Sequence, residues 1–195
     1  MKNLFLFLTL LVLSVSVNAQ EEKQKDTTKI QQLDEVLVKA VRVDADSPIT
    51  HSNVSKAEIE KRNLGQDVPI LLNYLPSVVT TSDAGAGIGY TGIRVRGTDA
   101  TRVNVTINGI PYNDPESQGT FWVNLGDIAS STESIQLQRG VGTSTNGSGA
   151  FGASLDLLTD VFSEDASAEI SNSFGSYTTR KHTVKIREWR GKEHI

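Results

Sequence analysis

The sequence predicts an α+β fold, a small mixed β-sheet with short helices, followed by one or two further strands. Two runs of alternating apolar and polar residues, 93–96 and 103–107, flank a polar turn at 97–101 and are typical of half-buried strands. A capping-box pattern, Ser55 followed by Glu58, indicates the start of a helix. Hydrophobic residues make up 37% of the chain and there are 16 Gly, which favours turns and loops over a dense helical core.

Residues 92–114 are the centre of this prediction, and we interpret them as a hairpin. Its buried face is expected to carry the apolar residues Ile93, Val95, Val103, Val105 and Ile107. The opposite face is expected to carry Arg94, Arg96, Asn104 and Thr106. The second strand ends at Asn108-Gly109, a dipeptide that accepts positive φ angles and therefore predicts a turn.

Length, charge and the absence of Cys limit the classes of function. The 195 residues allow one domain, or one small domain with tails. The net charge of −4 and the lack of a Lys/Arg-rich patch argue against nucleic-acid binding. Without Cys the chain forms no disulfide, no thiolate metal site and no thiol nucleophile.

The N-terminus has the three parts of a signal peptide. Lys2 gives a positive charge, residues 4–13 form an apolar stretch, and Val17-Asn18-Ala19 resembles a cleavage site. The apolar stretch is short for the alternative, an uncleaved membrane anchor. We therefore expect residues 1–19 to be removed and the protein to be exported.

A polar leader is expected over residues 20–44, because residues 20–32 are charged and lack apolar periodicity. Residues 33–38, Leu-Asp-Glu-Val-Leu-Val, are β-prone and lie within it. They are either the first strand of the domain or a strand offered to the sheet edge of another protein. Residues 39–50 look like further connector, which favours the second alternative.

The remaining elements follow from caps, breakers and alternation. A helix is expected from Ser55 to about Arg62 and ends before Gly65. A second short helix is expected after Asp67, with Pro69 in its first turn. Strands are expected at 78–81, 134–141, 153–159, 166–174 and 178–186, a helical turn at 127–128, and loops at 82–90 and 111–120.

Motifs that would indicate catalysis or cofactor binding are weak. The glycine patterns at 87–92 and 147–152 match G-x-G-x-x-G, but strand-like runs follow both, so the phosphate-binding helix is missing. The three His residues, His51, His182 and His194, have no ligand spacing, and there is no G-x-S-x-G elbow. We expect no enzyme activity, no cofactor and no metal centre, and a secreted hydrolase lacks the residues it would need.

The order of these motifs resembles a TonB-dependent outer-membrane receptor. Residues 33–38 look like the TonB box, and residues 93–97 with 103–111 look like paired motifs of the plug domain. Asn108 stands where family members often have Asp, which preserves the turn chemistry. Residues 133–140 and 149–157 resemble the closing motif of the plug, so the resemblance covers roughly residues 33–160.

The resemblance implies energy-coupled transport across the outer membrane, without catalysis. The plug sits inside a 22-stranded β-barrel, an extracellular small-molecule ligand binds outside, and TonB pairs with the box in the periplasm. An iron complex such as a siderophore is the expected ligand. The implied TonB-binding residues are Leu33, Asp34, Glu35, Val36, Leu37 and Val38. Plug–barrel contacts are expected at Arg94, Arg96 and Arg139, with plain surface solvation as the alternative, and ligand-facing loops at Ser82, Asp83, Tyr90, Tyr112, Asn113 and Gln118.

The predicted domains are a signal peptide at 1–19, the leader at 20–44, the plug at 45–160, and the start of a truncated barrel with an aberrant tail at 161–195. Twenty-two strands of about 10 residues need roughly 220 residues, far more than follow residue 160. We therefore expect a truncated or frameshifted reading frame, or a barrel on a separate chain. The alternative function is a free-standing periplasmic binding or signalling domain.

Overall fold

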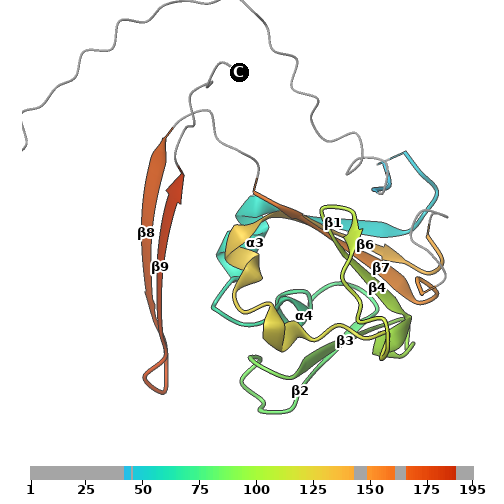
Figure 1. The fold of residues 1–195 in the computed structure, drawn as a ribbon, viewed down its shortest axis with the longest axis horizontal. Helices are drawn as coiled ribbons and strands as arrows, with labels where there is room; N and C mark the ends of the chain where they lie inside the picture. The colour runs from blue at the N-terminus through green and yellow to red at the C-terminus, as the bar shows by residue number, and fades with distance from the viewer. Residues whose placement is uncertain (1–41, 45, 143–148, 161–165, 188–195) are drawn as a thin grey trace, which may run out of the picture. The chain divides into compact units, whose positions relative to one another are not determined.

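The computed structural model describes residues 42–44, 46–142, 149–160 and 166–187, all within one compact unit that spans Glu35–Ile195. Its main element is a five-stranded sheet in the order β1-β6-β7-β4-β5 (Figure 1). The strands are β1 His51–Ser55, β4 Val103–Ile107, β5 Ile110–Pro111, β6 Thr132–Arg139 and β7 Ala153–Thr159. β4 and β7 run parallel, and the other neighbours are antiparallel.

Short helices and a second, two-stranded sheet accompany the main sheet. The helices are α3 Lys56–Arg62 and α4 Val68–Leu71, with 3₁₀ turns η1 Ala100–Arg102, η2 Trp122–Asn124 and η3 Ile128–Ser131. The second sheet pairs β2 Val78–Ser82 with β3 Thr91–Val95. A separate antiparallel hairpin follows, made of β8 Ser167–Phe174 and β9 Arg180–Arg187. The predicted α+β class, a mixed sheet with short helices and further strands, is confirmed.

The hydrophobic core packs against one face of the five-stranded sheet. Alternation along the two central strands supplies Ile135 and Leu137 from β6 and Leu155 and Leu157 from β7, all fully buried. The register pairs Ile135 with Leu157 and Leu137 with Leu155. The cluster also includes residues of α3, α4, the turn after α4, β3, η2 and η3: Ile59, Val68, Leu71, Leu72, Leu75, Ile93, Val95, Trp122 and Ala129.

The opposite face of the sheet carries polar residues that are aligned across the strands. Asn53, Gln136, Asp156 and Thr106 are register partners on β1, β6, β7 and β4, and we call them the transverse polar row. Gln136 and Asp156 are each only 2% exposed. Gln136 Nε2 donates to Asn53 Oδ1 at 2.8 Å, and Thr106 Oγ1 donates to Asp156 Oδ2 at 2.6 Å. Buried polar groups in folded proteins are normally hydrogen-bonded in this way.

The two predicted helices are present, and each is fixed by a local signal. The Glu58 carboxylate accepts a hydrogen bond from the Ser55 N–H at 2.9 Å, as the capping-box pattern predicts. Pro69 occupies the first turn of α4. Asp67 stands at the N-cap position of α4, but its carboxylate accepts bonds from Gly89 N at 3.0 Å and Thr91 Oγ1 at 2.8 Å instead of capping the helix.

The predicted hairpin of residues 92–114 is wrong, because its two strands belong to different sheets. β3 pairs with β2, while β4 pairs with β7 and β5. The polar turn between them folds into η1, where Asp99 Oδ1 accepts a bond from Thr101 N at 3.0 Å and redirects the chain. Alternation predicts which face of a strand is buried, but it does not choose the partner strand.

The predicted burial in this segment is nevertheless largely confirmed. Ile93, Val95, Val103 and Val105 are buried and join one core, with Ile107 partly buried against it. Thr106 corrects the predicted solvent face, because it is buried in the transverse polar row. Asn108 and Gly109 have φ angles of 52° and 78°, and they form the predicted tight turn, between β4 and β5.

Two further differences concern the N-terminal side of the domain. β1 was not predicted, because its sequence His-Ser-Asn-Val-Ser has a single large apolar residue, Val54, and reads as a connector. Residues 42–44 were expected to belong to the flexible leader. Val43 is instead buried, and Arg42 forms an ion pair with Asp156, so the folded body already includes these residues.

The hairpin of β8 and β9 has one polar face and one mainly apolar face, and the latter also carries Asn172, Arg180 and His182. Ile170, Phe174, Val184 and Ile186 are each 66–75% exposed, and the register pairs Ile170 with Val184. The other face carries Glu169, Ser171, Ser173, Lys181, Thr183 and Lys185, which line a common recess with residues of α3 and η3. Among the described residues, no helix is long and apolar enough to span a membrane.

Candidate functional site

Two arginines meet where β3 and β6 end. Arg96 is exposed and has a positive φ of 54°. Arg139 is 7% exposed and donates from Nε to the Pro76 carbonyl at 2.9 Å and from Nη2 to Ser52 Oγ at 2.6 Å. A Cβ atom at Gly140 would lie 2.8 Å from Arg96 Nη1, so glycine leaves room for the Arg96 side chain.

The electrostatics of this pair are unfavourable within the described part of the chain. Burial lowers the pKa of Arg139, and the nearby charge of Arg96 lowers it further. None of the ion pairs among the described residues involves Arg96 or Arg139. Two like charges with no described carboxylate partner form a site that suits an anionic group supplied from outside. Arg94 is exposed on β3, and its charge contributes to lowering the pKa of Asp99, after the hydrogen bonds from Thr101.

The two arginines should respond differently to truncation. Arg139→Ala leaves the Pro76 carbonyl and the Ser52 hydroxyl without their donor, and we expect it to lower the free energy of unfolding by about 2–3 kcal/mol. Arg96→Ala removes a repulsive charge and should change stability by less than about 0.5 kcal/mol. Urea unfolding of the two variants measures the difference. Equal losses of stability would mean that Arg96 already has a partner within the chain.

The first predicted ligand-facing loop connects β2 to β3 and is anchored by hydrogen bonds. Gly87 N donates to Ser82 Oγ at 3.0 Å, and Asp83 N donates to the Tyr90 carbonyl at 3.1 Å. The Asp67 bonds described above fasten the same loop to the start of α4. Asp83 is exposed and Tyr90 is 67% exposed, whereas Ser82 is half-buried. The tip of this loop is therefore open to a partner or ligand.

The second predicted loop contains residues that serve mainly the fold. The Asn113 side chain accepts from Val105 N at 2.7 Å and donates to the Val103 carbonyl at 3.0 Å, so it replaces a strand beside β4. Tyr112 is half-buried and packs against the core. Gln118 is exposed, with a positive φ of 57°.

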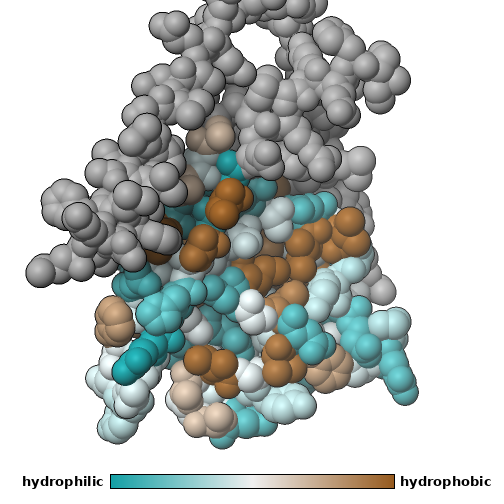
Figure 2. Space-filling view, turned by 60° about the vertical axis from the view of Figure 1, so that its left-hand side comes forward, coloured by the Kyte–Doolittle hydropathy of each residue, from teal (hydrophilic) through white to brown (hydrophobic). Residues whose placement is uncertain are grey.

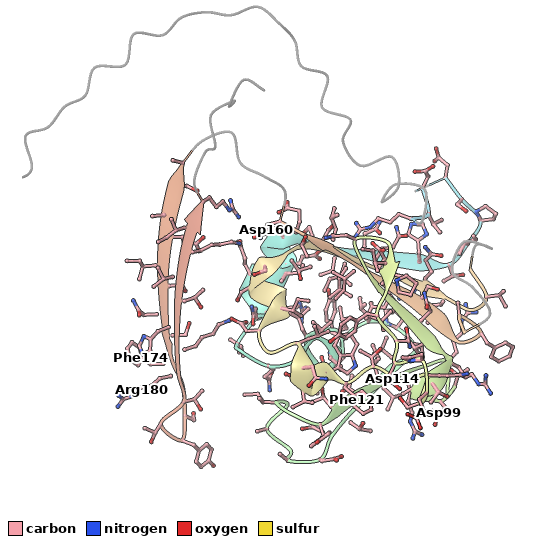
Figure 3. The ribbon with its side chains drawn as sticks, viewed as in Figure 1. Asp99, Asp114, Phe121, Asp160, Phe174 and Arg180 are labelled. Atoms are coloured by element: carbon pink, nitrogen blue, oxygen red, sulfur yellow. The ribbon has the colours of Figure 1, made fainter. Side chains whose placement is uncertain are left out.

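Residues that the sequence did not single out complete this surface. A recess of about 340 Å³ is lined by Arg102, Asp114 and Gly149 together with the predicted Asn113 and Gln118. A second recess, about 210 Å³, is lined by apolar groups that include Phe121 and Trp122, and it also contains Thr91 from the end of the first loop. Figure 3 labels Asp99, Asp114 and Phe121 around the end of the molecule that holds η1. The place of Arg102 in the lining of this recess depends on long-range packing. Its local sequence resembles any polar turn and does not predict that place.

Exposed apolar side chains accompany these loops. Ile88 and Tyr90 from the first loop and Phe121 and Val123 near the second are each 42–67% exposed. On the face drawn in Figure 2, apolar residues form several patches separated by polar ones. Scattered exposed apolar residues are normal, but a group on loops beside a recess suits ligand contact.

Asp160 connects the main body to the hairpin. Its carboxylate forms ion pairs with Lys56 of α3, with Lys185 of β9, and with Arg187 Nη2 at 3.3 Å. Burial by itself would raise the pKa of Asp160, but hydrogen bonds and charges from Lys185 and Lys56 lower it to about 2. Lys181 Nζ adds a pair to Asp127 Oδ1 at 2.7 Å.

This carboxylate predicts an acid-sensitive contribution to stability. Because the pKa of Asp160 lies near 2 when folded and near 3.8 otherwise, its contribution is complete above about pH 4 and disappears as the pH falls towards 2. The expected loss is about 2 kcal/mol in the free energy of unfolding. Urea unfolding from pH 5 to pH 2 should show a flatter pH dependence for Asp160→Asn than for the parent chain. Parallel curves would contradict the pairing.

Metal-binding and phosphate-binding patterns can be checked against the described part of the chain. No group of three or more His, Asp or Glu residues there is arranged to hold a metal ion. Gly92 lies within β3 and β7 follows Gly152, so each glycine pattern leads into a strand, as predicted, and not into a helix. The predicted TonB-binding residues Leu33, Asp34, Glu35, Val36, Leu37 and Val38 lie outside the described residues.

Comparison with known families identifies the class of protein. A sequence model of the TonB-dependent receptor plug domain matches residues 43–154, which is more than half of the chain. The chain therefore belongs to the TonB-dependent receptor plug domain family, whose members are non-enzymatic outer-membrane transport receptors. A search of curated proteins finds no match.

Several solved structures share this fold at low sequence identity. FpvA of P. aeruginosa, solved with heterologous pyoverdines, is 14% identical with a TM-score of 0.59 over 72% of this chain and 18% of its own. Fiu, the ferric-catecholate import receptor of E. coli K12, is 22% identical with a TM-score of 0.57 over 75% and 20%. The siderophore receptor PiuA of Acinetobacter baumannii is 22% identical with a TM-score of 0.56 over 75% and 19%. The matched region spans about a fifth of the length of these receptors.

Proposed function

We propose that this chain is the plug region of an outer-membrane receptor that takes up an iron complex such as a siderophore with energy delivered by TonB. The observation that carries the proposal is the hairpin directly after the plug. Its polar face is paired with the plug through Lys181 and Lys185, and its mainly apolar face, which also carries Asn172, Arg180 and His182, is exposed. Strands with one lipid-facing apolar side and one polar inner side are the building unit of an outer-membrane barrel.

The hairpin has the dimensions and chemistry of a first pair of barrel strands. β8 and β9 have eight residues each, close to the 9–11 that a spanning strand needs. Phe174 lies at the turn end of the apolar face, and Tyr177 is fully exposed in the turn. Aromatic residues at the ends of spanning strands are typical of the membrane interface. In this proposal Asp160 holds the first strands against the plug that they enclose.

The arginine pair supports a plug that sits within a barrel. Arg96 and Arg139 lie side by side without a described carboxylate partner, and an acidic residue on the inner wall of a barrel would neutralise them. We propose this contact for Arg96. Arg139 is a second candidate, with less of its guanidinium available because its Nε and Nη2 already donate to Pro76 and Ser52. Exposed Arg94 is a third candidate for the same wall.

The open loops supply the ligand-facing surface in this proposal. Ser82, Asp83 and Tyr90 border the first loop, and Gln118 lines the polar recess beside Arg102. Tyr112 and Asn113 contribute by holding the second loop in place. The ligand class is taken from the resemblance and accords with three of the similar structures, since FpvA binds pyoverdines, Fiu imports ferric catecholates and PiuA is a siderophore receptor.

Cell fractionation tests the location. Membranes of cells that make the protein are separated on a density gradient and probed with antibodies against this chain. We expect the protein in the outer-membrane fraction, after removal of residues 1–19. Recovery in the soluble periplasm alone would contradict the receptor and support a free-standing binding or signalling domain. Growth of a deletion strain with a ferric siderophore as the only iron source tests the ligand class, because unchanged growth on every siderophore tried contradicts iron uptake.

A further inference from the structure

The exposed face of the β8–β9 hairpin changes its chemistry along the strands. Apolar residues form the half that is farther from the turn, where the register pairs Ile170 with Val184. The half beside the turn is polar and aromatic, and Tyr177 in the turn itself is fully exposed. We call this second half, with Tyr177, the turn-end patch, and its residues are Asn172, Phe174, Tyr177, Arg180 and His182.

Contacts within the patch hold its side chains together. The His182 Nδ1 atom lies 2.7 Å from Asn172 Oδ1. The rings of Phe174 and His182 meet edge to face, with their centroids 5.9 Å apart and their planes at 79°. Phe174 and Arg180 are register partners, and Figure 3 shows them close to the turn. Side chains that are already ordered lose less freedom when a ligand binds.

The charge of the patch is positive. Arg180 is exposed and takes part in none of the ion pairs among the described residues. Glu169 is the one carboxylate among the described residues of the hairpin, and it lies on the opposite face, in the recess shared with α3 and η3. The exposed face therefore offers a cation without a carboxylate beside it, and it complements an anionic partner.

We propose that the turn-end patch binds the phosphate of an anionic lipid headgroup at the membrane surface. This inference rests on the proposed function, which takes the apolar half of the same face to meet lipid. An arginine on the lipid-facing side of a strand is costly within the hydrocarbon layer and is tolerated near the interface. Arg180 therefore places the turn end of the hairpin among the headgroups. Its guanidinium has the planar fork that binds phosphate oxygens in pairs.

The dimensions of the patch fit one headgroup layer. The row of Asn172 and His182 and the row of Phe174 and Arg180 are two residues apart, which is about 7 Å along a strand. The headgroup layer on each side of the hydrocarbon is about 5–8 Å thick. Both rows lie within that layer when the apolar half of the face lies in the hydrocarbon. Phe174 and Tyr177 then have the position that aromatic residues prefer at the membrane interface.

Binding of the purified, exported chain to lipid vesicles tests the patch. One set of vesicles is made of phosphatidylcholine, and the other of equal parts of phosphatidylcholine and phosphatidylglycerol. Co-sedimentation measures the partition coefficient. We expect tighter binding to the anionic vesicles, although the chain as a whole has a net charge of −4. Arg180→Gln should weaken binding to the anionic vesicles about fivefold and leave binding to phosphatidylcholine unchanged.

Three comparisons separate the contributions to binding. Arg180→Lys keeps the charge without the fork and should lose less affinity than Arg180→Gln. Tyr177→Ser removes an interfacial aromatic side chain and should weaken binding to both kinds of vesicle. The matched control is Arg62→Gln on α3, because Arg62 is also exposed and its guanidinium lies over the Tyr74 ring, 3.5 Å from its centre. This control should bind both kinds of vesicle as the parent does.

A competition experiment distinguishes lipid phosphate from free phosphate. Inorganic phosphate should displace the chain from anionic vesicles no more than chloride does at equal ionic strength, because the patch also needs the interface for its aromatic residues. A much stronger effect of phosphate would mean that the site takes free phosphate, and it would overturn the lipid assignment.

The outcomes also separate the patch from the proposed function. Equal binding of the parent to both kinds of vesicle, or equal binding of the parent and Arg180→Gln to anionic vesicles, overturns the patch. If the protein is then still recovered in the outer-membrane fraction, the proposed function stands without it. A chain that binds neither kind of vesicle and is recovered only in the soluble periplasm overturns both.

Discussion

Val36→Pro is expected to abolish binding of TonB to a peptide of residues 20–44. In strand pairing the backbone of the box supplies the hydrogen bonds, and proline has no N–H to donate. The fixed φ and the bulk of the ring also disturb the neighbouring residues of the added strand. Isothermal titration of the periplasmic domain of TonB with parent and variant peptides measures the effect.

The same substitution outside the box gives the matched control. Thr28→Pro changes the leader five residues before Leu33 and should leave the affinity within about twofold of the parent. An unchanged affinity of the Val36→Pro peptide would contradict the assignment of residues 33–38 as the TonB box. A loss of affinity in both peptides would indicate that TonB binds a longer part of the leader than the box.

Leu155→Ala should cause the largest loss of stability of any single core truncation in the main sheet. Leu155 is fully buried on β7, between its register partners Leu137 and Val105, so the cavity it leaves is surrounded by sheet and cannot collapse easily. We expect the free energy of unfolding to fall by about 3–4 kcal/mol, a large part of the stability of a small domain. Urea unfolding followed by circular dichroism gives the value.

Leu64→Ala removes the same atoms from a surface position and serves as the control. Leu64 is 71% exposed, so its truncation should cost less than about 0.5 kcal/mol. Similar losses in Leu155→Ala and Leu64→Ala would mean that the core does not lie against the five-stranded sheet as described.

Local signals in the sequence predict the elements better than their partners. The capping box of Ser55 and Glu58, the Asn108-Gly109 turn and the alternation of Ile135 and Leu137 in β6 each act over a few residues, and each predicted element is confirmed. The pairing of β4 with β7 joins residues about 50 positions apart, and no local pattern encodes that choice. For the same reason, the predicted hairpin of 92–114 was wrong although its core residues were right.

The buried polar residues show the other limit of sequence reasoning. Gln136 and Asp156 sit in strands whose alternation predicts a solvent face, yet both are buried beneath Arg42 and Val43. A carboxylate in the middle of Ala-Ser-Leu-Asp-Leu-Leu-Thr was the available signal, because a charge within a central strand needs a partner. Its partner comes from a segment more than 100 residues earlier, which a reading of that strand alone does not reach.

The loop residues divide in a similar way. Exposure of the first loop at Asp83 and Tyr90 followed from its composition, since Gly-rich polar stretches form surface loops. The structural role of Asn113 could not be predicted from composition, because a side-chain amide that replaces a strand depends on the conformation of the whole loop. Arg96 and Arg139 were both expected at a plug–barrel interface, and burial now distinguishes them.

The central claim, that this chain carries the gate of a TonB-driven receptor, is tested most directly by titrating the isotope-labelled full chain with the periplasmic domain of TonB. We expect saturable changes in the nuclear magnetic resonance signals of residues 33–38, while the core signals of β6 and β7 keep their positions. Binding that leaves residues 33–38 unchanged, or no binding by a chain that is folded and whose leader is intact, would contradict the claim.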